Sequence, residues 1–310
     1  MECHEAPILV FAFCLIFALS KAIPPDKHYR SDYVYNRQTD AFYKIHIEET
    51  FNHGAAVTCS LEGATLMVPS TREDLIQAHA MMKSFPDIGD YFWIGADGKE
   101  HESVEEQPII NLHAESSEYE YVSPCDILTR RGEIESASCY HRRPFICKVA
   151  ANDAIYDSQC HVYSSAYQYY SSVGSCYKVS DVPLTWDQAY AECRAEGAHL
   201  VVLNSEAEHQ AVWDIIRAAP RAIGVQAFFF FFAGIRANRP TDGTPRVFRT
   251  VFNETLQEAG YSEWSEGEPN NYQDTEYCGT IFLNNGKYND VECAHLYQFV
   301  CEKEVHAATH

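Results

Sequence analysis

The chain has few basic residues. Its 310 residues include 23 lysines and arginines against 44 aspartates and glutamates, which gives a formal charge of −21. Nucleic-acid binding draws its affinity from basic side chains that neutralise phosphates, so the composition argues against a nucleic-acid partner and against an anionic membrane surface. The acidic surplus suits a soluble secreted protein or the binding of hard cations. The length suits about two domains of ~150 residues each.

Sequence signatures of enzymes are also missing. There is no G-x-S-x-G motif and no phosphate-binding loop. The 14 histidines contain no H-E-x-x-H motif and no closely spaced metal cluster, so they are interpreted as surface residues. An enzyme is therefore the least supported class of function, and no catalytic residue is predicted.

No uncharged hydrophobic run is long enough to span a bilayer, which takes ~20 residues. Residues 6–19 form a run of 14 at the extreme N-terminus, followed by small residues. This predicts a cleaved secretory signal over residues 1–22, although Glu2 and Glu5 are atypical of such signals, and a buried core helix is the alternative. We expect a secreted, extracellular protein without membrane insertion.

Cysteine, by contrast, is abundant. Loss of the signal removes Cys3 and Cys14 and leaves ten of the 12 cysteines, which predicts five disulfides in an oxidising compartment and no spare nucleophile. Eight of them form two sets with matching intervals, 66, 14 and 8 residues in the first and 85, 15 and 8 in the second. The sets are Cys59, Cys125, Cys139 and Cys147, and Cys193, Cys278, Cys293 and Cys301.

The sequence around these cysteines repeats as well. The pattern C-x-x-E-G-A-x-L begins at Cys59 and again at Cys193. Because the period is far above that of solenoid repeats, the chain is predicted to be a tandem duplication of one domain. We place the first domain at residues 29–149, a linker at 150–156 and the second domain at 157–304.

Each copy is predicted to have an α+β fold. In the second, Thr185 begins a capping box ahead of apolar residues at helical spacing, and Ser205 opens another helix, with Ser70 as its counterpart in the first copy. The segments 91–95 and 231–235 then have β character. The order indicates two helices early and loop-rich β structure late in each domain.

With this framework, the chain resembles the C-type lectin domain family, and the pair of domains resembles the immulectins, pattern-recognition lectins of moth and butterfly haemolymph. The resemblance implies two tandem C-type lectin-like domains, each with two helices and antiparallel β-sheets. In that family the helix cysteine pairs with the last cysteine and the inner two close a loop. The implied disulfides are Cys59–Cys147, Cys125–Cys139, Cys193–Cys301 and Cys278–Cys293, with Cys160–Cys176 as the N-terminal hairpin bridge of long-form domains.

The second copy carries five oxygen-bearing side chains at fixed distances from its cysteines, and Ca²⁺ takes about six to eight oxygen ligands. The resemblance implies that two neighbouring sugar hydroxyls complete the coordination. Glu268 with Asn270 would serve one hydroxyl and Glu276 with Asn289 the other, while Asp290 would bind the ion by side chain and carbonyl. Taken alone, the segment 268–271 could equally be an acidic turn.

The residue order around Pro269 carries a further implication. A cis bond before Pro269 would aim Glu268 and Asn270 at one point. In the family, the order Glu-Pro-Asn goes with mannose, N-acetylglucosamine and glucose, whereas Gln-Pro-Asp goes with galactose. Asn271 stands where the family's auxiliary calcium site often has aspartate, and the loop around Ala237 lacks acids, so we expect one calcium in this domain.

The first copy lacks this set. Ser123 stands two residues before Cys125, and Glu135 and Ser136 precede Cys139 where the second copy has Asn289 and Asp290. The proline at 108 lies too far upstream, and this copy is 19 residues shorter between its helix cysteine and its loop cysteine. We expect a lectin fold without the calcium–sugar site.

The predicted function is therefore a secreted, calcium-dependent lectin that binds mannose-type glycans on microbes or glycoproteins through its second domain. The resemblance implies a role in innate immunity, with avidity supplied by homo-oligomers or by the first domain. The alternative is a calcium-independent protein-interaction module, because fold does not fix function. Two further features do not depend on the choice between these functions. Asn253 begins an N-glycosylation sequon. The phenylalanine run at 228–232 is interpreted as a buried strand.

Overall fold

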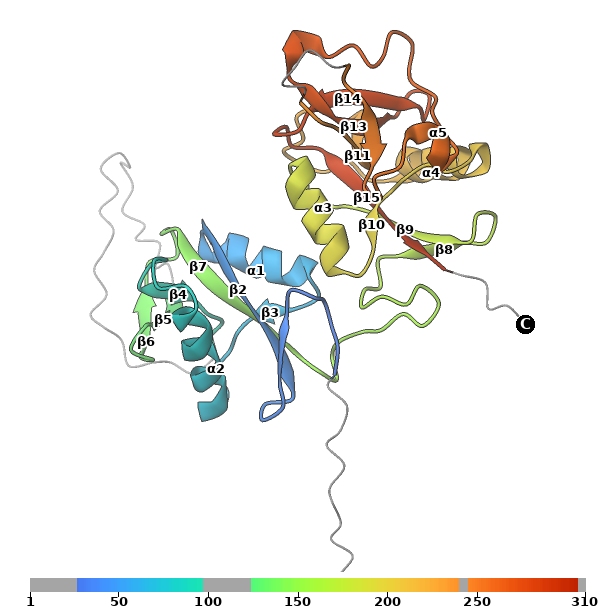
Figure 1. Ribbon diagram of the computed structural model, residues 1–310. Coiled ribbons are helices and arrows are strands. Elements are labelled where there is room, and N and C mark those ends of the chain that lie inside the picture. Colours follow the sequence, from blue (N-terminus) through green and yellow to red (C-terminus); the bar gives the residue numbers. More distant parts are fainter. Residues whose placement is uncertain (1–26, 97–123, 240–244, 306–310) are drawn as a thin grey trace, which may run out of the picture.

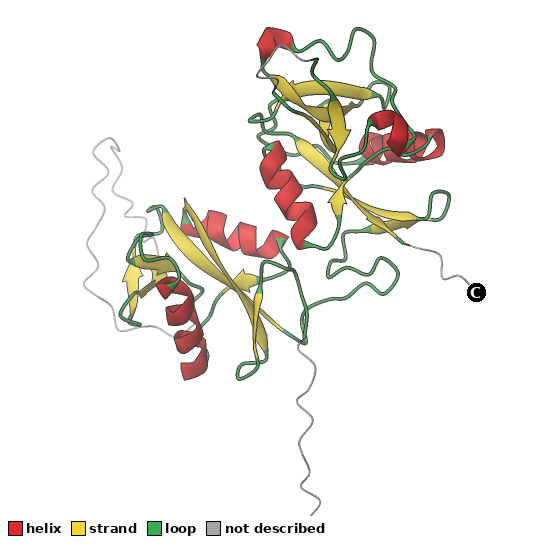
Figure 2. Cartoon of the chain, in the orientation of Figure 1, coloured by secondary structure: helices red, strands yellow, loops and turns green. Residues whose placement is uncertain are grey.

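The computed structural model describes residues 27–96, 124–239 and 245–305, which form two domains, each with its own sheet and helices (Figure 2). The predicted signal over residues 1–22 lies outside the described residues, as do the proline at 108 and Ser123. None of the helices in the described ranges is both long and apolar enough to cross a membrane.

In the described part of the first domain, seven strands form one sheet in the order β1-β2-β7-β4-β5-β6, with β3 paired to β7. β2 and β7 are antiparallel neighbours, whereas β4 runs parallel to β7. The elements are β1 (Val34–Asn36), β2 (Ala41–Thr50), α1 (Asn52–Leu61), β3 (Thr65–Leu66), α2 (Arg72–Lys83), β4 (Tyr91–Trp93), β5 (Cys125–Thr129), β6 (Ile134–Ala137) and β7 (Arg143–Ala150).

The described part of the second domain repeats this plan with eight strands in the order β14-β13-β11-β15-β9-β8, and β10 and β12 pair with β15 and β11. β11 runs parallel to β15, as β4 does to β7 in the first domain. The elements are β8 (Gln168–Tyr170), β9 (Ser175–Val179), α3 (Trp186–Ala195), β10 (His199–Leu200), α4 (Glu206–Ala218), β11 (Phe230–Ala237), β12 (Phe248–Thr250), α5 (Leu256–Ala259), η1 (Tyr272–Asp274), β13 (Glu276–Phe282), β14 (Tyr288–Glu292) and β15 (Gln298–Glu304).

Both helices predicted for the second domain begin at the expected caps. The Thr185 side chain accepts from the backbone N–H of Gln188, whose own side chain returns the bond, so α3 starts with a capping box. Ser205 caps α4 in the same position. In the first domain the cap is Thr71 rather than Ser70. Each such cap contributes about 1 kcal/mol to helix stability.

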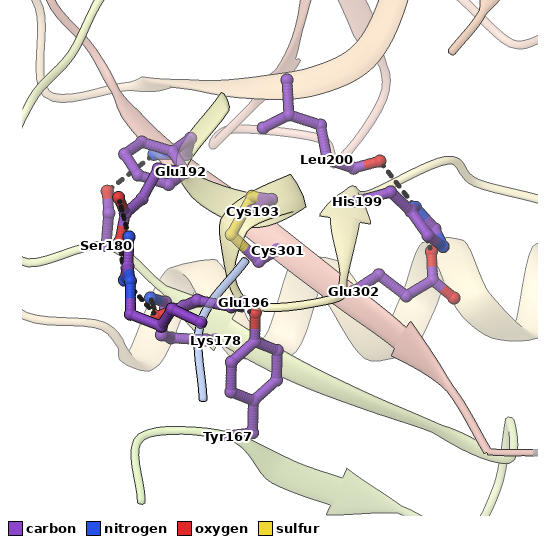
Figure 3. The surroundings of a disulfide bond; sticks show 12 residues. Tyr167, Lys178, Ser180, Glu192, Cys193, Glu196, His199, Leu200, Cys301 and Glu302 are labelled. Carbon is purple, nitrogen blue, oxygen red and sulfur yellow. Dashed lines mark hydrogen bonds and ion pairs between the residues drawn. A yellow bond between two sulfur atoms is a disulfide. The ribbon is translucent and has the colours of Figure 1, made fainter. Parts of the chain in front are cut away.

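All five disulfides pair as the resemblance implies. Cys193–Cys301 joins α3 to β15 in the core of the second domain (Figure 3). It closes a loop of 108 residues, for which chain-entropy arguments give a stabilisation of roughly 4–5 kcal/mol. In the first domain, Cys59–Cys147 joins α1 to β7.

The interpretation of the phenylalanine run as a buried strand is correct only for its last part. β11 starts at Phe230, where pairing with β13 begins, and Phe231 and Phe232 are fully buried. Phe228 precedes the strand and is 57% exposed. The run spans a loop-to-strand transition, so its residues do not share one environment.

The two domains meet around Arg30, whose side chain is 1% exposed. Its guanidinium donates to Asp32 in its own domain at 3.1 Å, and to Glu192 of α3 at 2.8 Å. The neighbouring Ser31 N–H donates to the Ala195 carbonyl across the interface at 2.9 Å. Figure 1 shows that α1 and α3 approach each other with their C-terminal ends at this contact.

Each domain brings the same three residue types to the contact: a tyrosine and a lysine that both bond to the glutamate at the end of the first helix. The two glutamates, Glu62 and Glu196, lie 3.8 Å and 3.4 Å from the Arg30 guanidinium. One arginine therefore lies between two copies of one motif. The sets are Tyr33, Lys44 and Glu62, and Tyr167, Lys178 and Glu196, the latter shown in Figure 3.

Candidate functional site

The predicted site residues converge at one end of the second domain, where a loop meets two paired strands. Glu268 and Asn270 lie in the loop before η1, and Glu276 is the first residue of β13. Asn289 and Asp290 lie in β14, opposite residues 280 and 279 of β13. The β13–β14 hairpin and the loop therefore place side chains that lie up to 22 residues apart in sequence at one position.

Asp290 is the centre of the hydrogen-bond network and is 1% exposed. Its Oδ1 accepts from the Asn270 N–H at 3.1 Å, and its Oδ2 accepts from the Asn271 N–H at 2.9 Å. Both oxygens of Glu268 also accept from Asn270, from the backbone N–H at 3.0 Å and from Nδ2 at 2.9 Å. The Glu268–Pro269 peptide bond between these partners is cis.

Glu276 and Asn289 are held by separate contacts. Glu276 Oε2 accepts from the Tyr272 N–H at 2.8 Å, and the Glu276 N–H donates to Asn271 Oδ1 at 3.2 Å. Asn289 is buried, and its Nδ2 donates to the Asp290 carbonyl at 2.5 Å. Hydrogen bonds of the polar residues predicted from the sequence thus hold the loop and the two strands together.

Burial and neighbouring negative charge raise the pKa of two of the carboxylates. Burial, a hydrogen bond shared with Asp290 and the charge of Glu276 raise the pKa of Glu268 to about 7. Burial and the charge of Asp290 also raise the pKa of Glu276. Carboxylates gathered in this way repel one another, and a cation placed among them relieves the repulsion.

The donor set fits calcium. Three carboxylates and two amides supply oxygen atoms, the ligand type that Ca²⁺ prefers, and no thiol or imidazole that would favour zinc is among them. In the described residues, the three carboxylates do not bring oxygens within 4.8 Å of one another all at once, so chelation would draw the side chains closer. Glu268, Asn270, Glu276, Asn289 and Asp290 are the residues that would hold the ion.

Arg246 is a member of this site that the sequence did not reveal. Its Nη1 donates to Asp290 Oδ2 at 2.6 Å and to the backbone carbonyl of Glu276, and its side chain is only 12% exposed. Arg246 lies in the segment before β12, outside the sequence motifs that surround the cysteines. Its role depends on tertiary contact alone.

The first domain has a different set of residues at the equivalent strand. Glu135 and Ser136 lie in β6, opposite Ile127 and Asp126 of β5. The equivalent positions of β14 hold Asn289 and Asp290, which face β13. Within the described part of this domain, the amide–carboxylate pair of the second domain is therefore not reproduced.

The interpretation of the histidines as surface residues is wrong for two of them. His46 is 8% exposed because it stacks on Phe145 at 4.3 Å and contacts Glu62. His209 is 6% exposed, stacked on Tyr261 and within 3.1 Å of the Asn285 carbonyl. Ring stacking and a polar partner compensate these histidines for burial.

Other groupings in the described residues do not compete with this site. His46 and Glu62 approach Cys147, but that cysteine is in a disulfide. His199, Glu302 and Glu304 also lie close together, yet the nearly buried Glu302 is already bonded by a serine hydroxyl and a backbone N–H. A cavity of about 590 Å³ lies along the N-terminal segment of the first domain, away from the carboxylates.

Comparison with known proteins agrees with the duplicated architecture. The Lectin C-type domain family matches residues 48–149 and 182–303. The "Hemolymph lipopolysaccharide-binding protein" of Periplaneta americana is 34% identical over 136 residues, 44% of this chain and 51% of that protein. The chain thus spans about half the length of that relative.

Two further comparisons concern single domains. The "C-type lectin mannose-binding isoform" of Notechis scutatus scutatus is 30% identical over 133 residues, 42% of this chain and 77% of that protein. Among solved structures, the carbohydrate-recognition domain of the mouse scavenger receptor C-type lectin aligns with a TM-score of 0.36 and 22% identity, covering 46% of this chain and 98% of that domain.

Proposed function

The chain belongs to the C-type lectin family, and on that premise we propose that it is a secreted, calcium-dependent lectin whose second domain binds mannose-type sugars. One observation carries the proposal: Glu268, Asn270 and Asp290 are hydrogen-bonded to one another, beside Glu276 and Asn289. Oxygen-rich sites of this kind suit Ca²⁺, and the lectin family is non-enzymatic.

The five residues offer hydrogen-bond donors and acceptors for two neighbouring hydroxyls of a sugar. A bound Ca²⁺ would supply the coordination of two neighbouring hydroxyls. Glu268 and Glu276 would each accept a hydrogen bond from one hydroxyl, while the amides of Asn270 and Asn289 would donate to the same oxygens. Asp290 is buried behind them and holds the loop through the backbone of Asn270 and Asn271.

The order of the residues and the names of two relatives support the proposed ligand class. Glu268-Pro269-Asn270 is the order that goes with mannose, N-acetylglucosamine and glucose rather than galactose. One relative is named as lipopolysaccharide-binding and another as mannose-binding, which supports glycans of microbial surfaces as ligands. A secreted lectin of this type would serve recognition of microbes in innate immunity.

Affinity chromatography on mannan tests the proposal. The full chain should be retained in calcium, released by a chelator and released by free mannose but not by free galactose. Retention that a chelator leaves unchanged would contradict calcium dependence. Release by galactose and not by mannose would contradict the specificity. An eluate that binds again after calcium is restored separates reversible release from denaturation.

A second function is favoured for the first domain alone. Its β6 carries Glu135 and Ser136 in place of the amide–carboxylate pair, so a calcium-independent protein contact fits this domain better than a sugar. The full chain carrying Glu276→Gln, used as bait in a chelator, isolates this activity. Capture of a defined partner under those conditions supports it, and capture that requires calcium argues against it.

A further inference from the structure

We propose that Arg246 is a built-in cation that keeps the calcium site assembled when no calcium is bound. The inference rests on the proposed function, because it concerns the residues proposed to bind the ion. It assigns a positioning role: Arg246 acts on the ligand side chains and does not touch the sugar.

The first support is the placement of the guanidinium. Arg246 bonds to two of the strands that carry the site, to Asp290 Oδ2 in β14 and to the Glu276 carbonyl in β13. The Asp290 side chain is fully buried, and the ion pair is largely shielded from water. Among the described residues, Arg246 is the one cationic side chain bonded to the site carboxylates. Its positive charge therefore offsets the mutual repulsion of these carboxylates.

The second support is the way the side chain is anchored. The Arg246 guanidinium lies 5.0 Å from the centre of the Phe248 ring and 6.0 Å from that of Tyr277. A planar guanidinium that stacks on aromatic rings keeps its fork of donors in a fixed orientation. The Arg246 side chain is thus packed into the wall of the site and is only 12% exposed.

The third support links the arginine to the loop. The backbone N–H groups of Asn270 and Asn271 both donate to Asp290, and that of Tyr272 donates to Glu276. These three amides close the loop onto the carboxylates that Arg246 aligns. Without a cation, the carboxylates would separate and the amides would lose their acceptors, unless calcium took over the role.

Hydrogen exchange of the full chain in a chelator tests this. The amides of residues 270, 271 and 272 should be protected in the unaltered protein. Arg246→Met keeps the apolar stem and removes the charge, so their protection should fall by about tenfold or more, as expected for loss of a charge-assisted hydrogen bond. Saturating calcium should restore it. Arg249→Met is the matched control, since the Arg249 side chain on β12 donates to the Asn253 carbonyl in an exposed turn, and this variant should change nothing.

Arg246→Lys separates charge from shape and also decides the question if the methionine variant does not fold. Lysine keeps the charge but loses the planar fork and its ring contacts, so protection in the chelator should fall by about three- to fivefold, less than in Arg246→Met. Protection that survives in Arg246→Met, or that is lost equally in Arg246→Lys, overturns the inference. Failure of the proposed function looks different: the unaltered chain would not bind mannan, and calcium would restore nothing in Arg246→Met.

Discussion

Glu276 is the residue whose role is easiest to isolate, because its carboxylate faces the loop while its backbone is part of β13. Glu276→Gln keeps the shape and an acceptor for the Tyr272 N–H but removes one charge from the ligand set. We expect retention on mannan in calcium to be lost, with the circular dichroism spectrum unchanged. Calcium binding measured by titration calorimetry should weaken by about tenfold or more, since ligand charge sets affinity in such sites.

Glu135→Gln is the matched control for that variant. It makes the same chemical change in β6 of the first domain, at the position equivalent to Asn289. It should leave mannan retention and calcium affinity as they are. Loss of retention in this control, or retention by Glu276→Gln, would mean that the site is assigned to the wrong domain or the wrong residues.

For single residues, the distance in sequence to a disulfide cysteine determined whether a role could be predicted. Glu276, Asn289 and Asp290 lie a few residues from Cys278 and Cys293, so the disulfide framework fixes their register and makes them recognisable. Arg246 has no such reference point. His46 and His209 are buried against Phe145 and Tyr261, respectively. Because these partners lie far away in sequence, no local sequence pattern predicts the burial.

Among the structural elements, the β13–β14 hairpin and its disulfide matter most for the site. Cys278–Cys293 spans 15 residues and ties the start of β13 to the residue after β14. The chain-entropy argument gives about 3 kcal/mol for a loop of this length. Replacing both cysteines by alanine should lower the free energy of unfolding by about that amount and weaken calcium binding, measured by denaturant titration and calorimetry.

The first domain supplies the control, because Cys125–Cys139 spans 14 residues in the equivalent place. Removing it should cost a similar free energy of unfolding but leave calcium affinity unchanged. Equal effects of the two double variants on calcium affinity would show that the change acts through global stability. A loss confined to the Cys278/Cys293 variant ties the hairpin to the site.

Elements with local signals could be predicted, and those without could not. The capping box at Thr185 and the cap at Ser205 are complete within four residues, so the two helices predicted for the second domain, α3 and α4, start as expected. Strand boundaries depend on partners. The phenylalanine run reads as one apolar segment, but pairing of Phe230 with Phe282 of β13 decides where the strand begins. Phe228 lies outside that pairing and is exposed.

In the whole molecule, the cluster around Arg30 couples the domains. Four carboxylates, two lysines and one arginine share the contact, and the C-terminal ends of α1 and α3, which favour positive charge, both point at it. The duplication was evident from the cysteines, but this contact was not. Arg30 has no counterpart in the second copy, where Ser164 follows Tyr163 at the same distance before the tyrosine of the motif.

Arg30→Met should therefore separate the domains. Removing one partner of a buried charge cluster typically costs about 3–5 kcal/mol, because the remaining carboxylates keep their burial and lose their cation. We expect a larger radius of gyration by small-angle scattering and faster proteolysis within residues 150–156. Arg131→Met, in the exposed turn between β5 and β6, is the control. An unchanged scattering profile for Arg30→Met would show that other contacts hold the domains together.

Acid should open the same contact through Glu62. Burial raises the pKa of Glu62. The hydrogen bond and charge of His46 and the charges of Arg30 and Lys44 outweigh this effect and lower the pKa to about 2. A pKa below the ordinary value near 4.3 means that Glu62 contributes stability above about pH 4.3 and loses it as the pH falls towards 2. The loss amounts to at most about 3 kcal/mol. Scattering and unfolding measured from pH 5 to about 2.5 should show the domains separating, with a weaker pH dependence in Glu62→Gln. Separation at pH 5 already, or an equal slope in that variant, would assign the transition to other groups.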